Sequence, residues 1–282
     1  AASLKTSNAT GKIVLVSDYN WVFSADSYQR DIAKAADYAH KYHVIYTGKT
    51  PDVSLNFTIQ KQSYIGTIGP TTFEYMNIRI APDSTDRYLS LHSRGYLVIG
   101  QGVTTASEEQ YQLSITGSSY YKSTMNPYLE INSGTWRNAY AGSYANTITG
   151  NGTLIFNGGT VNKIGVIYNG TFNGNANITI NGGTVGTLCA GALNTGTVGG
   201  TASVTLTGGT IQSTVTTKNT QGYTVELAPK GLTLDCGGTF VANTLTGGNM
   251  NLEAGTQLQI TDSVTGTTNI TPVSGVYFGT YL

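Results

Sequence analysis

A short motif that recurs about every 25 residues constrains the fold of this chain more than any other feature. Two glycines, a threonine and an apolar residue close three similar segments, residues 154–161, 178–185 and 204–211. With weaker copies included, the glycine before the threonine falls at positions 134, 159, 183, 209, 238 and 255, giving spacings of 25, 24, 26, 29 and 17 residues. A period of this length is typical of repeat proteins whose units stack on their neighbours.

Each copy has the alternation of a strand that buries one of its faces. The first and third positions before the glycines are apolar in all six copies: Leu129/Ile131, Leu154/Phe156, Ile178/Ile180, Val204/Leu206, Leu232/Leu234 and Met250/Leu252. A period of two places both side chains on one side of a strand. Threonine and a bulky apolar residue then begin a further strand. Trp136 is therefore expected to point inward, in the position shared by Val161, Val185, Ile211 and Phe240.

Strands and turns in this order predict an all-β fold, a single-stranded parallel β-helix (solenoid). Parallel strands stack about 4.8 Å apart, so a coil with two or three short strands closes one turn of such a helix. An antiparallel sandwich is the alternative fold. It would not place the same Asn-Gly-Gly-Thr string at the same point of successive units.

The residue before the glycines is polar in every copy. Asn132, Asn157 and Asn181 occupy this position in three successive copies, and the next three copies carry Thr207, Asp235 and Glu253. Short amide side chains at the same bend of successive coils can hydrogen-bond along the stack. We therefore expect an asparagine ladder whose Cα atoms lie about one strand spacing, 4.8 Å, apart.

The first half of the chain differs in composition. Residues 1–144 hold 23 of the 30 charged residues and 15 of the 19 tyrosines, while residues 145–282 hold 26 of the 36 glycines. Apolar alternation predicts earlier strands at residues 57–59, 76–80, 89–91, 97–99 and 113–115. Helical spacing predicts a short N-terminal amphipathic α-helix at 27–41 that caps the solenoid. The expected domains are residues 1–50, an N-terminal strand and the capping helix, and residues 51–282, one continuous β-helix.

Composition excludes several classes of function. Fifteen basic and fifteen acidic residues cancel, and charged residues make up 11% of the chain, so no nucleic-acid partner is expected. No apolar run reaches the ~20 residues of a membrane-spanning helix, so no membrane insertion is expected. The chain begins Ala1-Ala2-Ser3 without a basic and apolar signal region. Any export signal is expected to have been removed or to lie upstream.

Two cysteines, Cys189 and Cys236, are 47 residues apart, which is nearly two coils. Stacked coils would separate them by more than the ~7 Å between Cα atoms that a disulfide tolerates. Both are therefore predicted to be free thiols.

Three segments carry a resemblance to a known family: residues 69–78 (GPTTFEYMNI), 96–105 (YLVIGQGVTT) and 133–140 (SGTWRNAY). They resemble the pectate-lyase-like, right-handed β-helix modules of large bacterial cell-surface proteins, and the resemblance covers roughly residues 50–260. It implies a right-handed solenoid within a larger multi-module protein, extracellular or on the bacterial surface. It does not imply one activity, because this fold carries lyases, glycosidases, adhesins and passive stalks.

The repeats lack the clustered acids and basic partner that a pectate-type lyase needs. Residues 145–282 contain four acids, of which Asp235 and Glu253 share the bend position, where they could bind a cation or simply extend the ladder. Glu108 and Glu109 are adjacent but are expected in a solvated turn rather than as the carboxylate pair of a glycosidase. An enzyme could instead assemble a site in the tyrosine-rich half from Asp83, Asp86, Arg87, Arg94, Glu108 and Glu130.

No metal or cofactor site is predicted. His40 and His43 are spaced i, i+3 at the end of the expected helix, which could suit a metal. A helix C-terminus favours histidine electrostatically in any case, and no third ligand is near. Metalloprotease, nucleophile-elbow and phosphate-loop motifs are missing from the sequence.

Aromatic residues gather where the two compositions meet, with Tyr111 and Tyr128 beside the main group. The candidate carbohydrate-binding residues are Tyr120, Tyr121, Trp136, Arg137, Tyr140 and Tyr144. Sugar rings stack on aromatic side chains while their hydroxyls seek polar partners. Arg137 and Tyr144 are expected to face solvent, whereas an inward Trp136 would serve the core instead.

The favoured function is a non-catalytic extracellular module that binds a polysaccharide or glycan, or acts in adhesion and surface display. The alternative is a polysaccharide lyase or glycoside hydrolase acting on acidic or plant polysaccharide. Ice binding is a third hypothesis, but it needs flat outward threonine rows, and the pattern provides one column: Thr179, Thr205 and Thr233.

Overall fold

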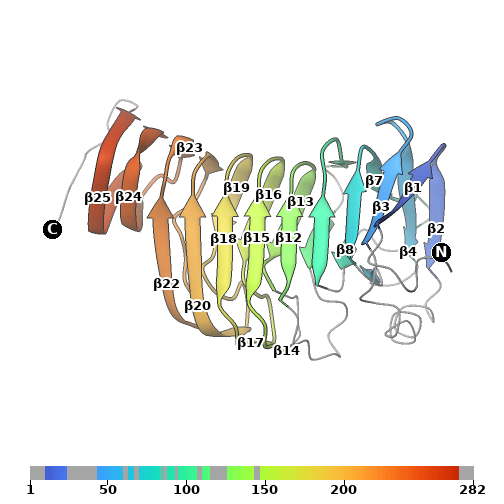
Figure 1. Ribbon diagram of the computed structural model, residues 1–282, viewed down its shortest axis with the longest axis horizontal. Helices are drawn as coiled ribbons and strands as arrows, with labels where there is room; N and C mark the ends of the chain where they lie inside the picture. The colour runs from blue at the N-terminus through green and yellow to red at the C-terminus, as the bar shows by residue number, and fades with distance from the viewer. Residues whose placement is uncertain are drawn as a thin grey trace.

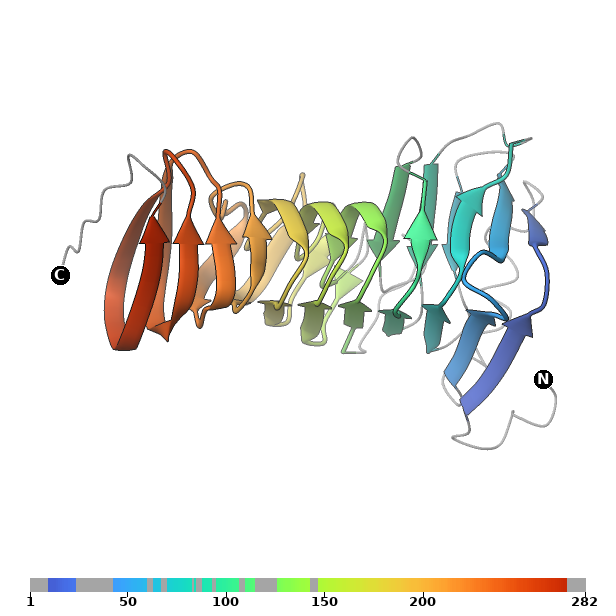
Figure 2. The same ribbon diagram turned by 90° about the horizontal axis from the view of Figure 1, so that it is seen from above.

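The computed structural model describes residues 10–23, 43–59, 63–66, 70–82, 84, 88–92, 95–106, 110–114, 126–142 and 147–272. Within these ranges the chain consists of strands and turns without a helix, which confirms the all-β class. The strands stack side by side along an elongated body (Figure 1, Figure 2). The predicted capping helix at residues 27–41 lies outside the described residues. None of the described segments is a helix of the length and apolar character needed to cross a membrane.

One row of strands runs along the whole body. This first row comprises β1 (Thr10–Leu15), β3 (His43–Gly48), β6 (Thr71–Glu74), β9 (Tyr96–Ile99), β12 (Tyr128–Ile131), β15 (Gly152–Phe156), β18 (Ala176–Ile180) and parts of β20 (Thr197–Leu206), β22 (Thr220–Leu227), β24 (Thr239–Leu252) and β25 (Gln257–Pro272). Each of these strands pairs in parallel with the next one in the row. Residues 10–48 therefore already contribute paired strands of the solenoid.

Two further rows complete the coils. The second row begins with a four-stranded sheet of β2 (Tyr19–Phe23), β4 (Ser54–Ile59), β7 (Asn77–Ile80) and β10 (Thr104–Thr105) and continues with β13 (Thr135–Tyr140), β16 (Thr160–Gly165), β19 (Thr184–Leu188), β21 (Gly209–Ile211) and β23 (Lys230–Leu234). The remaining strands are β5 (Ser63–Gly66), β8 (Tyr88–His92), β11 (Gln110–Ser114), β14 (Thr147–Ile148) and β17 (Thr171–Phe172). The strands predicted in the first half thus exist.

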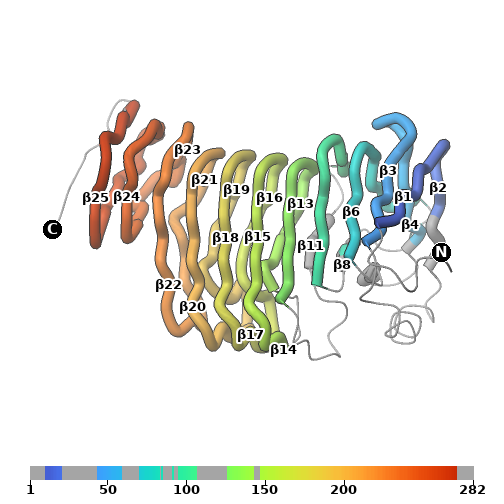
Figure 3. Tube along the Cα trace, viewed as in Figure 1, coloured from blue at the N-terminus to red at the C-terminus, as the bar shows by residue number. Residues whose placement is uncertain are grey.

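Pairing from one coil to the next defines a parallel β-solenoid. In the central coils β12 pairs with β15, β13 with β16 and β14 with β17, always in parallel, so each coil contains three strands. The chain runs once around the body before it meets its own previous coil (Figure 3). Coil length changes along the molecule. Leu129 and Leu154 pair with residues 25 and 24 positions later, whereas Leu227 and Leu245 pair with residues 18 and 19 positions later.

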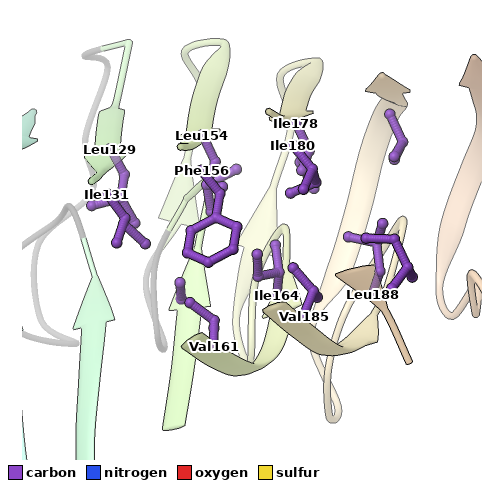
Figure 4. Close-up of a cluster of buried hydrophobic side chains, with 14 of the residues drawn as sticks. Leu129, Ile131, Leu154, Phe156, Val161, Ile164, Ile178, Ile180, Val185 and Leu188 are labelled. Carbon is purple, nitrogen blue, oxygen red and sulfur yellow. The ribbon is translucent and has the colours of Figure 1, made fainter. Parts of the chain in front are cut away.

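The apolar residues of the repeat form stacked columns inside the coils. Leu129, Leu154 and Ile178 share one register position on the first row, and Ile131, Phe156 and Ile180 share another. All six are 0% or 1% exposed and point into the interior between the rows (Figure 4). The predicted inward position of Trp136 is confirmed, because Trp136 pairs with Val161 and is 1% exposed. The period-two alternation therefore identifies the core.

Two assignments of the repeat are wrong beyond residue 211. Leu232 and Leu234 follow Gly209 and Ile211 in the second row, not Val204 and Leu206 in the first. Phe240 consequently leaves the Trp136 column and pairs with Leu258. The first-row position is filled by Val225 and Leu227, which pair with Val204 and Leu206. The signal was missed because β22 is followed by Ala228-Pro229-Lys230 instead of a glycine pair.

The predicted asparagine ladder is present at the bend after the first row. Nδ2 of Asn157 donates to Oδ1 of Asn132 at 2.8 Å, and Nδ2 of Asn181 donates to Oδ1 of Asn157 at 2.8 Å. Thr207 extends the ladder, its hydroxyl donating to Oδ1 of Asn181 at 2.6 Å. Asp235 does not continue it, since its backbone amide bonds to Ile211 of the second row. The ladder spans four coils.

The glycines of the motif are required by close stacking. Gly159 has a φ of +89°, and a Cβ atom there would lie 2.3 Å from the carbonyl oxygen of Gly134 in the previous coil. A side chain would therefore clash with backbone as well as strain φ. The cysteines also agree with the coil arithmetic, because Cys189 and Cys236 are both free.

Replacing Asn157 with alanine should reduce the free energy of unfolding by about 1–3 kcal/mol, because it leaves the Oδ1 of Asn132 and the Nδ2 of Asn181 without ladder partners. Urea denaturation measures the loss. Asn177→Ala is the matched control, since Asn177 is an exposed residue of β18 outside the ladder. Equal losses in the two variants would contradict a stabilising ladder.

Trp136→Ala should cost about 3–5 kcal/mol of stability, because it removes the largest buried side chain of the described core and leaves a cavity. The neighbouring variant Arg137→Ala alters an exposed position and should cost far less. Thermal and urea unfolding compare the two. A small effect of Trp136→Ala would show that the coil can collapse around the missing ring.

Candidate functional site

The structure places three of the six predicted carbohydrate-binding residues. Tyr120, Tyr121 and Tyr144 lie outside the described residues. The other three belong to β13: Trp136 and Tyr140 are 1% and 0% exposed, while Arg137 is exposed.

Both buried aromatic side chains of β13 have partners inside the protein. The indole Nε1 of Trp136 donates to the carbonyl oxygen of Ser133 at 2.9 Å. The ring of Tyr140 meets the ring of Tyr168 edge-on, with centroids 6.1 Å apart. A sugar cannot stack on rings that the core covers, so Arg137 is the described member of the predicted set that remains accessible.

A different group of aromatic and polar side chains lies on the outer side of the first row. Tyr96 of β9 and Tyr128 of β12 pair in register on adjacent coils, and their rings stack with centroids 4.9 Å apart and planes 9° apart. The ring of His43 meets Tyr96 edge-on at 5.4 Å, and its Nε2 forms a 2.8 Å hydrogen bond with the hydroxyl of Thr72. We call Tyr96, Tyr128 and Glu130, with His43 beside them, the tyrosine–glutamate cluster.

Glu130 joins the tyrosine stack to the asparagine ladder. Its Oε2 accepts a 2.6 Å hydrogen bond from the hydroxyl of Tyr128. Its Oε1 accepts hydrogen bonds from Nδ2 of Asn132 at 3.0 Å and from Nδ2 of Asn157 at 3.4 Å. The carboxylate is thereby held in place by three donors from two adjacent coils.

Strand alternation explains why these side chains point outward together. Leu129 and Ile131 are fully buried, so the residues between and before them, Tyr128 and Glu130, must lie on the other side of β12. The same alternation turns Tyr96 outward beside the buried Leu97. Because the two strands pair without a shift, the phenol rings are one strand spacing apart, which is the separation of stacked rings.

The environment keeps the cluster in defined protonation states. Burial, the hydrogen bond to Glu130 and then the charges of Glu130 and of Tyr96 raise the pKa of Tyr128 well above its usual range. Burial and the Glu130 charge also raise the pKa of Tyr96. Partial burial lowers the pKa of His43. At neutral pH the phenols are therefore protonated donors and the imidazole of His43 is uncharged.

This arrangement is suited to binding rather than to proton transfer. A glycosidase positions two carboxyl groups about 5–9.5 Å apart around the bond that it cleaves. In the cluster Glu130 stands as a single carboxylate, and three hydrogen bonds hold it. Among the described residues no three metal-ligating side chains come together. Asp235 and Glu253, which could share a cation, occur as a pair on successive coils of the second row.

Two hollows lie near the N-terminal coils. One has a volume of about 420 Å³ and is lined by Lys12, Thr47, Lys49 and Tyr75 among others. Its Lys12 ammonium is already paired with Glu74 at 3.0 Å. The other, of about 230 Å³, is apolar and is lined by Ile13, Leu15, Tyr19, Tyr46 and Leu55. It opens onto the apolar column of the first row, which makes it the end of the core.

Sequence reasoning noticed Tyr128 and Glu130 separately but did not join them. The signal that could have done so is the string Tyr-Leu-x-Ile, which occurs at 96–99 and again at 128–131. The interval of 32 residues is longer than the later repeat, so the two copies did not enter the same register. Residues 69–78 and 96–105 drew attention as a family resemblance rather than as neighbouring coils.

Comparison of the chain with protein-family models, with curated proteins and with solved structures finds no match.

Glu130→Gln should lower the pKa of Tyr128 toward the ordinary phenol value, because it removes the negative charge that disfavours phenolate. Alkaline titration followed by phenolate absorbance measures the shift, and Tyr128→Phe identifies which transition belongs to Tyr128. Glu226→Gln changes an exposed acid elsewhere and should leave this transition in place. An unchanged Tyr128 transition in Glu130→Gln would contradict the hydrogen bond.

Proposed function

We propose that this chain is a non-catalytic, carbohydrate-binding module of an extracellular or cell-surface bacterial protein. The observation that carries the proposal is the Tyr96–Tyr128 stack bound to Glu130 on the outside of the first row. Aromatic faces bind the apolar side of sugar rings, and a few polar groups fix the orientation of the hydroxyls. Both kinds of group occur together in the cluster.

The setting of the cluster favours recognition by a rigid surface. Its side chains stand on paired strands, which hold positions more firmly than loops do. The next coil carries Thr153 in register with Tyr128, so the aromatic stack ends there and a small side chain follows. A sugar ring placed over Thr153 would continue the stack on the open face of Tyr128. The amides of Asn132 and Asn157 lie beside that position through their contacts with Glu130.

The wider assignment comes from the resemblance of three segments to pectate-lyase-like modules. On that basis the solenoid is right-handed, belongs to a larger multi-module surface protein, and serves glycan binding, adhesion or surface display. The parallel solenoid supports this assignment at the level of architecture. Cleavage of polysaccharide is disfavoured by the single, triply hydrogen-bonded carboxylate of the cluster.

A glycan array on the purified protein, followed by titration of retained glycans, tests the proposal. Tyr128→Ala should weaken binding about tenfold, because one stacked ring contributes on the order of 1 kcal/mol. Tyr223→Ala is the control, since Tyr223 is a 40% exposed tyrosine on β22, away from the cluster.

Two further variants separate the cluster from the region predicted from sequence. Arg137→Ala and Tyr144→Ala should weaken retention if that region also binds, and should leave the melting temperature nearly unchanged. Retention that is insensitive to Tyr128→Ala would overturn the role of the cluster. Release of sugar fragments, or of unsaturated uronate in a lyase assay, would overturn the non-catalytic assignment.

A further inference from the structure

The tyrosine–glutamate cluster contains a negative charge whose described partners are neutral. Glu130 accepts hydrogen bonds from the hydroxyl of Tyr128 and from the amides of Asn132 and Asn157. Among the residues that the structure describes, the ion pair within 4 Å is the one between Lys12 and Glu74, so Glu130 lacks a cationic partner there. A carboxylate has about four lone-pair sites, and three are in use.

The rings beside this charge have the same preference. The faces of phenol rings carry negative charge density, which attracts ammonium groups. Tyr96 covers one face of Tyr128, and the position of Thr153 on the following coil leaves the other face without an aromatic partner. The charge of Glu130 also contributes to the raised pKa of both tyrosines, so the local potential is negative.

We propose that the sugar recognised by the cluster carries a free amino group, whose ammonium lies against the open face of Tyr128 and pairs with Glu130. This inference rests on the proposed carbohydrate-binding function and specifies its ligand class. An acidic sugar would instead meet like charge at Glu130, which costs binding energy. An N-acetylated sugar would keep the ring stacking but offer no cation to the carboxylate.

Two oligosaccharides of equal length and linkage provide the probes: β-1,4-linked glucosamine oligomers with free amines, and their fully N-acetylated counterparts. Calorimetric titration at low ionic strength should give about tenfold tighter binding of the free-amine form. The preference should shrink as salt is added, because the pair is only partly buried.

Glu130→Gln should abolish the preference while keeping the side chain's size and its ability to accept from Tyr128. Glu226→Gln is the matched control, because Glu226 occupies the same register position four coils further along the first row and has no tyrosine pair beside it. It should bind both probes as the unaltered protein does. Tyr128→Phe keeps the ring and frees Oε2 of Glu130, so it should retain the preference.

The outcomes separate this inference from the proposed function. Equal binding of the two probes, with loss of both in Tyr128→Ala, would overturn the amino-sugar inference and keep carbohydrate binding. A free-amine preference that survives in Glu130→Gln, or that disappears equally in Glu226→Gln, would also overturn it. Failure of the unaltered protein to bind either probe or any other glycan would overturn both proposals. Loss of the preference in Tyr128→Phe would show that the hydrogen bond, rather than ring and charge, is responsible.

Discussion

In-register stacking of coils is the constraint on which the rest of the structure depends. When residues at one position lie a strand spacing apart, a good neighbour on one coil must also be a good neighbour on the next. Asparagine satisfies this requirement through its amide, which donates to one neighbour and accepts from another, as Asn157 does between Asn132 and Asn181. Leucine, isoleucine and phenylalanine satisfy it by filling continuous buried columns. Glycine satisfies it where backbone approaches backbone, as at Gly159.

The same rule shapes the outer surface, where it brings chemistry together. Tyr96 and Tyr128 are distant in sequence, yet pairing without a shift makes them a stacked pair. Glu130 then connects that pair to the asparagine ladder, so the ladder both stabilises the bend and orients a carboxylate. Structural and recognition roles thus share side chains instead of occupying separate regions. A substitution in the ladder would reach the cluster through a single hydrogen bond.

Much of the fold could be predicted from the sequence because the repeat reports directly on strand stacking. The columns of Leu154, Phe156 and Val161 and the ladder at Asn157 follow from the position of each residue relative to the glycines. The prediction was wrong at Leu232 and Phe240, because β22 ends without the motif and the count then slips by one strand.

The candidate site was harder to predict. It depends on pairing across an interval of irregular length, which the regular repeat does not reveal. Trp136 and Tyr140 illustrate the opposite difficulty, since aromatic content alone does not distinguish a binding ring from a core ring. A second asparagine ladder, in which Asn151 and Asn175 donate backbone amides to the residue one coil back, also had a regular spacing that could have been used.

The shortening of the coils has a consequence for how the molecule opens. A coil of 18 or 19 residues encloses a thinner interior than one of 24 or 25, and Leu258 and Ile260 are each 8% exposed where their counterparts in the central coils are sealed. In a solenoid each coil is stabilised chiefly by its two neighbours, so fraying begins where those interfaces are weakest. The narrow coils therefore act as a sacrificial end, and the wide coils that carry Tyr128 and Glu130 remain closed while the narrow ones breathe.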